Sequence, residues 1–84
     1  MIRKTVTIEL ATGLEATPVA MLVQLASQFD SNIYLETNSA RVNAKSIMGM
    51  MTLGLALGEE VIVSAEGSDE ESAVNRIEEY LRNQ

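Results

Sequence analysis

The spacing of hydrophobic residues changes along the chain between two periods, and these changes predict strands and helices in a definite order. Between residues 2 and 10, apolar and polar side chains alternate one by one, which is typical of a strand with one buried face. The same period recurs in three later segments: residues 32–37, 40–43 and 60–65. Asn38 and Ser39 separate the second strand from the third and predict a hairpin turn.

Helical spacing begins after the first strand. Thr17 and Pro18 predict the start of a helix, because threonine is a good N-cap and proline is tolerated at the first helical position. The apolar residues that follow recur every three or four positions and predict one buried helix face. This stripe consists of Val19, Leu22, Val23, Ala26 and Phe29.

Two further helices are predicted in the second half of the chain. Residues 45–53 predict a short helix with Ser46 near its cap, and Ser68 with Glu71 has the form of a capping box before a final helix. The order is then β-α-β-β-α-β-α, which predicts a two-layer α+β domain of four strands with helices on one face. Periodicity alone does not separate this fold from a ferredoxin-like sheet, which shares the first six elements.

Composition narrows the classes of function. Eighty-four residues suit one domain, spanning residues 1–84, and the net charge of −6 with scattered basic residues argues against direct binding of nucleic acid. The chain has no cysteine and no histidine, which excludes disulfides, thiolate nucleophiles, histidine acid–base chemistry and histidine metal ligation. The acidic runs at residues 59–60 and 69–71 are interpreted as solvated surface, so we expect neither metal nor cofactor.

The same observations predict a location. No apolar run reaches the roughly 20 residues that span a bilayer, and the N-terminus leads directly into strand-like sequence without a signal-peptide core. The absence of cysteine fits a reducing compartment. We therefore expect a cytoplasmic protein that does not associate with membranes.

Two short motifs carry a family resemblance. The first is GLEATP at residues 13–18, and the second is KSIMGMM at residues 45–51. Shorter supporting matches are LVQ at residues 22–24, VNA at residues 42–44 and LG at residues 53–54. Together they resemble HPr, the phosphocarrier family of the bacterial sugar phosphotransferase system, over nearly the whole chain. The resemblance implies an HPr-like open-faced β-sandwich, in which three helices cover one face of a four-stranded antiparallel sheet.

The sequence departs from the family at the phosphotransfer site. The resemblance places the family's active histidine at Glu15 and its arginine, two residues later, at Thr17. A carboxylate at this position repels an incoming phosphate, and threonine removes a guanidinium that would bind phosphate through two hydrogen bonds. We therefore expect no catalytic residue, no histidine phosphotransfer and no enzymatic activity.

The serine motif, in contrast, is intact, and in this the chain resembles the Crh-type members of the family, which lack the active histidine and act in regulation. The resemblance implies that HPr kinase/phosphorylase phosphorylates Ser46 and that the phosphoprotein is a corepressor for a CcpA-type repressor in carbon catabolite repression. The predicted partner-binding residues are Ala20, Ile47, Met48 and Met51. An N-cap role for Ser46 is compatible with phosphorylation, because a phosphate there would lie against free helix N–H groups.

Two other functions remain open at this point. The first is a divergent phosphocarrier that passes phosphate through Glu15, and the second is an interaction module that binds a metabolic enzyme without any modification. Ile47, Met48 and Met51 also fit an ordinary core at helical spacing, although Met50 and the leucines that follow can face inward instead. A homodimer that exchanges its first strand is compatible with the resemblance.

Overall fold

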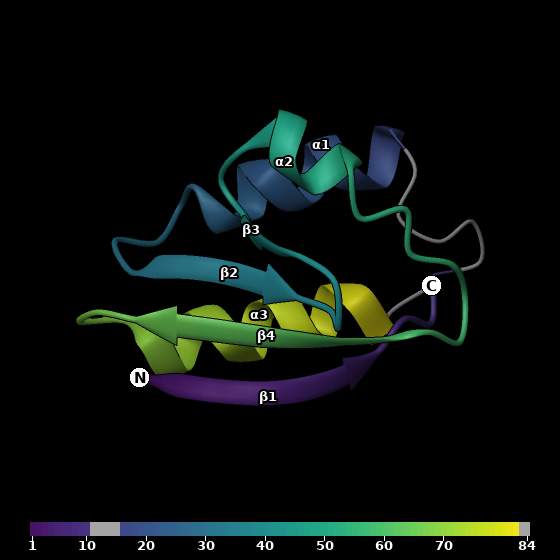
Figure 1. Cartoon of the computed structure of the whole chain (residues 1–84). Coiled ribbons are helices and arrows are strands. Elements are labelled where there is room, and N and C mark those ends of the chain that lie inside the picture. The colour runs from purple at the N-terminus through teal and green to yellow at the C-terminus, as the bar shows by residue number, and fades with distance from the viewer. Residues whose placement is uncertain (11–15, 83–84) are drawn as a thin grey trace.

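The computed structural model describes residues 1–10 and 16–82, and its elements follow the predicted order. In chain order they are β1 (Ile2–Thr7), α1 (Ala16–Ala26), β2 (Asn32–Glu36), β3 (Arg41–Asn43), α2 (Ile47–Met51), β4 (Glu60–Glu66) and α3 (Glu70–Arg82). The strands form one antiparallel sheet in the order β1-β4-β2-β3. In a ferredoxin-like sheet the first and third strands are neighbours, whereas here β1 and β3 are opposite edges (Figure 1), which decides between the two predicted folds.

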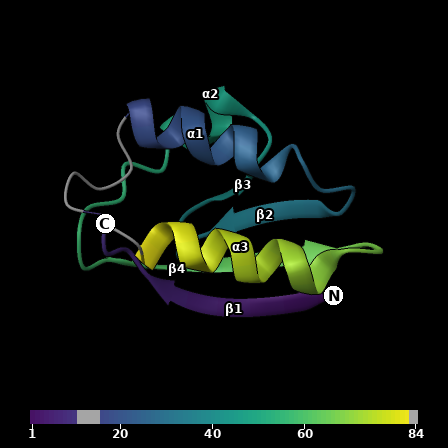
Figure 2. The same cartoon turned by 180° about the vertical axis from the view of Figure 1, so that it is seen from behind.

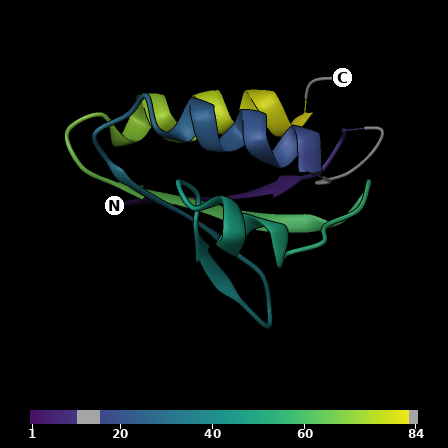
Figure 3. The ribbon, with the colours of Figure 1, turned by 90° about the horizontal axis from the view of Figure 1, so that it is seen from above.

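The helices leave one face of the sheet open. Figure 2 shows α1 and α3 in front of the sheet, and the view from above in Figure 3 places both on the same side of it. The short helix α2 contacts α1 and β3 and so closes the core at the β3 edge. The predicted open-faced sandwich is confirmed. No helix within residues 1–10 and 16–82 is long and apolar enough to cross a bilayer.

The core lies between the sheet and the helices, and it is built almost entirely from aliphatic side chains. Its largest fully buried members are Ile8, Leu22, Ile33, Leu35, Met50, Ile77 and Leu81. The predicted stripe of α1 is buried as expected, except that Phe29 lies beyond the end of the helix and is only partly buried. Alternation in β4 also holds, because Val61, Val63 and Ala65 face the core.

The start of α1 differs from the prediction. Thr17 is a helical residue and not the N-cap, because α1 already includes Ala16, and the residues before it lie outside the described part of the chain. Pro18 therefore belongs to the first turn, where its missing N–H costs no helical hydrogen bond. The Tyr80 hydroxyl of α3 donates to the Pro18 carbonyl oxygen at 3.1 Å, so α3 fixes the position of this turn.

The start of α3 differs in a similar way. The predicted capping box of Ser68 and Glu71 is wrong, because the helix begins at Glu70. The carboxylate of Glu70 instead accepts a hydrogen bond of 3.1 Å from the backbone N–H of Gly67, which lowers the pKa of Glu70. A glutamate thus bonds to the backbone N–H three residues before it, as in a capping box, but the pair is Glu70 with Gly67 and it lies at the turn before the helix.

Asp69, which immediately precedes α3, fastens the loop between α1 and β2. Its carboxylate accepts hydrogen bonds from the backbone N–H groups of Asp30 at 2.9 Å and Ser31 at 3.0 Å, and from the Ser31 hydroxyl. The bond from the Ser31 hydroxyl is the main reason that the pKa of Asp69 is lowered. We call the contact of Asp69 and Gly67 with Ser31 the loop clasp. Ser31 is buried within it, only 1% exposed.

The first strand and the short helix α2 both end earlier in the chain than predicted. The first strand ends at Thr7, and α2 spans only Ile47–Met51. The end of α2 has a local cause, because both the backbone N–H and the hydroxyl of Thr52 bond to the carbonyl oxygen of Gly49. These bonds close the last turn, and Gly54 follows with a positive φ of 57° that takes the chain away from the helix axis.

Candidate functional site

Ser46 is the N-cap of α2, as predicted. Its backbone is extended, with φ −111° and ψ 114°, and its hydroxyl oxygen accepts a hydrogen bond of 3.2 Å from the backbone N–H of Gly49. Glycine at position 49 keeps this approach close, because a Cβ there would lie 3.4 Å from the Ser46 hydroxyl oxygen. The side chain of Ser46 is half-buried, so its oxygen is engaged in the cap and still reachable from outside.

The residues after Ser46 divide between the core and the surface. Met50 is completely buried and anchors α2, whereas Ile47 is 50%, Met48 84% and Met51 51% exposed. Met50 is the one buried residue among the five of α2. The interpretation of Ile47, Met48 and Met51 as ordinary core residues is therefore wrong, and three large apolar side chains lie next to the serine.

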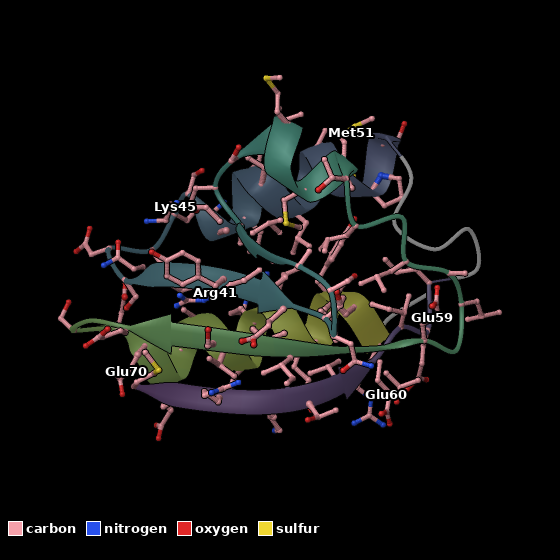
Figure 4. All side chains as sticks on the ribbon, in the orientation of Figure 1. Arg41, Lys45, Met51, Glu59, Glu60 and Glu70 are labelled. Atoms are coloured by element: carbon pink, nitrogen blue, oxygen red, sulfur yellow. The ribbon has the colours of Figure 1, made fainter. Side chains whose placement is uncertain are left out.

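Helix α1 packs against α2 and adds to this surface. Thr17 is exposed and Ala20 is half-buried, while Met21 is 56% exposed although the sequence analysis did not single it out. The signal was present, because Met21 falls between the buried positions Val19 and Leu22 of the stripe. We call the exposed residues Met21 of α1 and Ile47, Met48 and Met51 of α2 together the methionine surface; Figure 4 labels Met51.

Lys45 joins the turn before Ser46 to the segment that follows α1. Its ammonium group donates to the carbonyl oxygen of Phe29 at 2.7 Å, and its backbone N–H donates to the Asn43 side chain at 2.8 Å. The backbone N–H of Ser46 donates to the Asn43 carbonyl oxygen at 3.0 Å. These hydrogen bonds hold the backbone of the turn before α2 in place, and they thereby fix the position of the Ser46 backbone from which its side chain extends.

The other predicted position, Glu15, lies outside the described residues. Thr17, two positions later in the sequence, is exposed on α1 and carries no charge. Within residues 1–10 and 16–82, no group of three or more histidine, cysteine, aspartate or glutamate side chains is arranged to hold a metal ion. The described site therefore combines one hydroxyl with an exposed apolar surface, an arrangement that suits modification and docking.

The comparisons with known proteins agree on one family. Residues 2–83 match the family model described as the PTS HPr component phosphorylation site. The chain is 43% identical over 82 residues to the HPr-like protein Crh of Bacillus subtilis strain 168, covering 98% of this chain and 96% of that protein. The crystal structure of the phosphocarrier protein HPr from Bacillus anthracis matches with a TM-score of 0.92 at 40% identity, covering 95% of each chain. The crystal structure of Bacillus subtilis Crh, described as a domain-swapped dimer, matches with a TM-score of 0.78 at 43% identity, covering 98% of this chain and 94% of that one.

Proposed function

The chain belongs to the HPr family, and on that premise we propose that it is a Crh-type regulatory protein of carbon catabolite repression. In this proposal HPr kinase/phosphorylase phosphorylates Ser46, and a CcpA-type repressor then binds the phosphoprotein as its corepressor. The observation that carries the proposal is the position of Ser46 at the border of the methionine surface. Phosphorylation of this one hydroxyl would add negative charge at the edge of a docking surface that is otherwise apolar.

The N-cap geometry makes the modification compatible with the fold. A phosphate on Ser46 adds about −1.5 to −2 charges at pH 7 and three acceptor oxygens, close to the first N–H groups of α2. Met50 is completely buried and anchors α2 to the core, so we expect it to stay in place. Phosphorylation therefore changes the surface presented to a partner while the backbone of α2 stays in place.

The sequence supports regulation over phosphate transfer. The chain contains no histidine, so the phosphohistidine chemistry of a carrier has no residue to act on. Thr17 is exposed on α1 and offers no guanidinium to an anion. The proposal accordingly includes no catalytic residue and no enzymatic activity. It places the protein in the cytoplasm, where an ATP-dependent kinase and a DNA-bound repressor are found.

A homodimer belongs to the proposal as its oligomeric form. The Bacillus subtilis relative crystallised as a swapped dimer. Within the described residues β1 is an edge strand whose one neighbour is β4, and an ion pair from Lys4 to Glu78 at 2.6 Å joins it to α3. Arg82 of α3 pairs at 3.0 Å with Glu9, which follows the end of β1. An edge strand near the chain terminus is the element that exchanges with least disturbance of the core. Light scattering after size-exclusion chromatography, at several protein concentrations, tests for the dimer.

Phosphorylation is tested with purified components. The protein is incubated with HPr kinase/phosphorylase, ATP and magnesium, and its intact mass is recorded beside the Ser46→Ala and Ser72→Ala variants. Ser72 is an exposed helical serine on α3 and is the matched control. We expect one added phosphate on the wild type and on Ser72→Ala, and none on Ser46→Ala. Absence of labelling, with an authentic HPr labelled in parallel, would overturn the proposal and favour an unmodified interaction module.

Repressor binding is tested with the phosphorylated protein. Truncation of Met48 to alanine removes the most exposed side chain of the methionine surface, and we expect affinity for the repressor to fall about tenfold. Leu57→Ala is the matched control, because Leu57 is 58% exposed but lies in the turn before β4. Equal losses for both variants would show that binding does not use the methionine surface. A carrier function would appear instead as labelling of Glu15 by phosphorylated Enzyme I.

A further inference from the structure

The open face of the sheet carries an unusual arginine. Arg41 of β3 lies with its guanidinium 4.1 Å from the centre of the Tyr34 ring on β2. Figure 4 shows Arg41 in front of the sheet, on the face opposite α3. A guanidinium stacked on an aromatic ring keeps its edge N–H groups available, because the ring takes up only its planar face. The stack thus orients the N–H groups of the Arg41 guanidinium over β2, where Tyr34 lies.

Arg41 also differs from the other cations of the chain. Four of the six basic side chains form ion pairs: Arg3 with Glu36, Lys4 with Glu78, Arg76 with Glu79, and Arg82 with Glu9 and Glu78. The ammonium of Lys45 is bonded to a backbone carbonyl. Among residues 1–10 and 16–82, Arg41 is the basic residue without a carboxylate or carbonyl partner, in a chain whose net charge is −6. Its donors are therefore free to bind an anion from outside.

A buried hydroxyl lies beneath this arginine. Ser64 of β4 points to the open face, where alternation predicts exposure, yet it is only 3% exposed. Its cross-strand neighbours explain the burial, because Arg3 on β1 and Tyr34 on β2 are both directly opposite it. No side-chain oxygen or nitrogen within the described residues is buried without a hydrogen-bond partner, so the Ser64 hydroxyl is not sealed in the sheet as an unsatisfied group. It lines the hollow described next and can be reached by a ligand there.

These groups line one hollow. Its volume is about 290 Å³, and its walls are Met1, Arg3, Glu36, Arg41 and Ser64. Arg3 and Arg41 reach it from β1 and β3, the opposite edges of the sheet, and Arg3 is held there by Glu36 at 3.2 Å. Two guanidinium groups and a hydroxyl therefore converge on a space large enough for a small ligand. None of these residues belongs to the methionine surface or to the cap of α2.

We propose that Arg41, Arg3 and Ser64 form a binding site for the phosphate group of a small phosphate monoester. A guanidinium binds phosphate through two parallel hydrogen bonds, and Arg41 offers that fork without first breaking an ion pair. The Ser64 hydroxyl donates a further bond to the same oxyanion. Glu36 opposes the ligand, because its carboxylate competes for Arg3 and repels the incoming charge. The site and the Ser46 surface are separate, so the proposal does not depend on the regulatory function.

The test is a titration of the isotope-labelled protein followed by amide NMR shifts. Glycerol 3-phosphate is the probe, acetate represents a carboxylate, and sodium chloride at matched ionic strength reports general screening. Three variants carry the argument: Arg41→Gln, Glu36→Gln and Arg76→Gln. The last is the matched control, because it changes the charge by the same amount on α3, outside the hollow.

The variants are expected to change the affinity for glycerol 3-phosphate in opposite directions. We expect saturable shifts at Arg3, Tyr34, Arg41 and Ser64, with affinity about fivefold or more weaker in Arg41→Gln, about threefold tighter in Glu36→Gln, and within about twofold of the wild type in Arg76→Gln. Absence of saturable shifts, or equal effects of Arg41→Gln and Arg76→Gln, would overturn the site. Binding of acetate as tight as that of glycerol 3-phosphate would overturn its assignment to phosphate.

Discussion

Replacement of Gly67 by alanine tests whether the loop clasp stabilises the fold through close backbone packing. Gly67 has a positive φ of 155°, and a Cβ built on it would lie 2.7 Å from both the Cα and the hydroxyl oxygen of Ser31. Rotation of a side chain does not relieve the contact with Cα. Ser31 is also fixed from the other side, because Asp69 bonds to its backbone N–H and to its hydroxyl. The alanine must therefore displace either β2 or the turn before α3.

The magnitude follows from two costs and one gain. The strained backbone region costs about 1–3 kcal/mol and overpacking typically costs about 1–3 kcal/mol, while alanine recovers about 0.4–1 kcal/mol by restricting the unfolded chain. We expect Gly67→Ala to lower the free energy of unfolding by about 3 kcal/mol, a large fraction of the roughly 5–15 kcal/mol typical of a domain. Gly54→Ala is the control: φ there is 57°, but nothing lies within 4 Å of the new Cβ. Its expected cost is about 1 kcal/mol.

The assay is urea unfolding followed by far-ultraviolet circular dichroism, with the slope compared among variants to confirm that each unfolds as the wild type does. In the Ser31→Ala background, Gly67→Ala should cost less, because one of the two 2.7 Å contacts has been removed. Equal losses for Gly67→Ala and Gly54→Ala would refute the steric argument, since the two sites share a positive φ and differ in the space around them.

Three further predictions concern the clasp, the first turn of α1 and the cap of the serine. The fold holds the pKa of Asp69 below its ordinary value of 3.8, so its carboxylate stabilises the protein above that pH, and this contribution is lost as the pH falls through the lowered value. Ser31→Ala should therefore flatten the loss of stability in acid unfolding curves, and an unchanged curve would contradict this assignment. Tyr80→Phe removes the bond to the Pro18 carbonyl and should cost about 1 kcal/mol in urea unfolding, whereas no loss would mean that the bond is replaced by water. Ser46→Ala should cost about 1 kcal/mol and Ser46→Asn, which keeps a capping oxygen, clearly less; equal costs would exclude a capping role.

The sequence predicted elements well where local pattern decides them. The strands follow from alternation and α3 from helical spacing, because each element has one face that must be buried whatever surrounds it. Ser46 as an N-cap was predictable for the same reason, since the hydroxyl, Gly49 and the start of the helix are neighbours in the chain. The family motifs added the sheet order, which periodicity alone left open.

The errors lie where a distant residue determines the local structure. Ser68 and Glu71 have the form of a capping box, but Asp69 bonds to Ser31, 38 positions earlier in the chain, and the helix begins at Glu70. Alternation in β4 places Ser64 on the face away from the core, and its burial depends on long side chains from two other strands. The exposure of Met21 was implicit in its place outside the stripe, whereas the packing of α1 against α2 is a tertiary fact.

The methionines of α2 lie at different depths, and this has a consequence for oxidation chemistry. Oxidants convert an exposed thioether to a polar sulfoxide, and sulfoxide reductases reverse the change. Met48 and Met51 are 84% and 51% exposed, while Met50 is completely enclosed. A mild oxidant would therefore turn the docking surface polar while leaving the anchor of the helix intact. If the methionine surface binds a partner as proposed, oxidation would weaken that binding before it disturbs the fold.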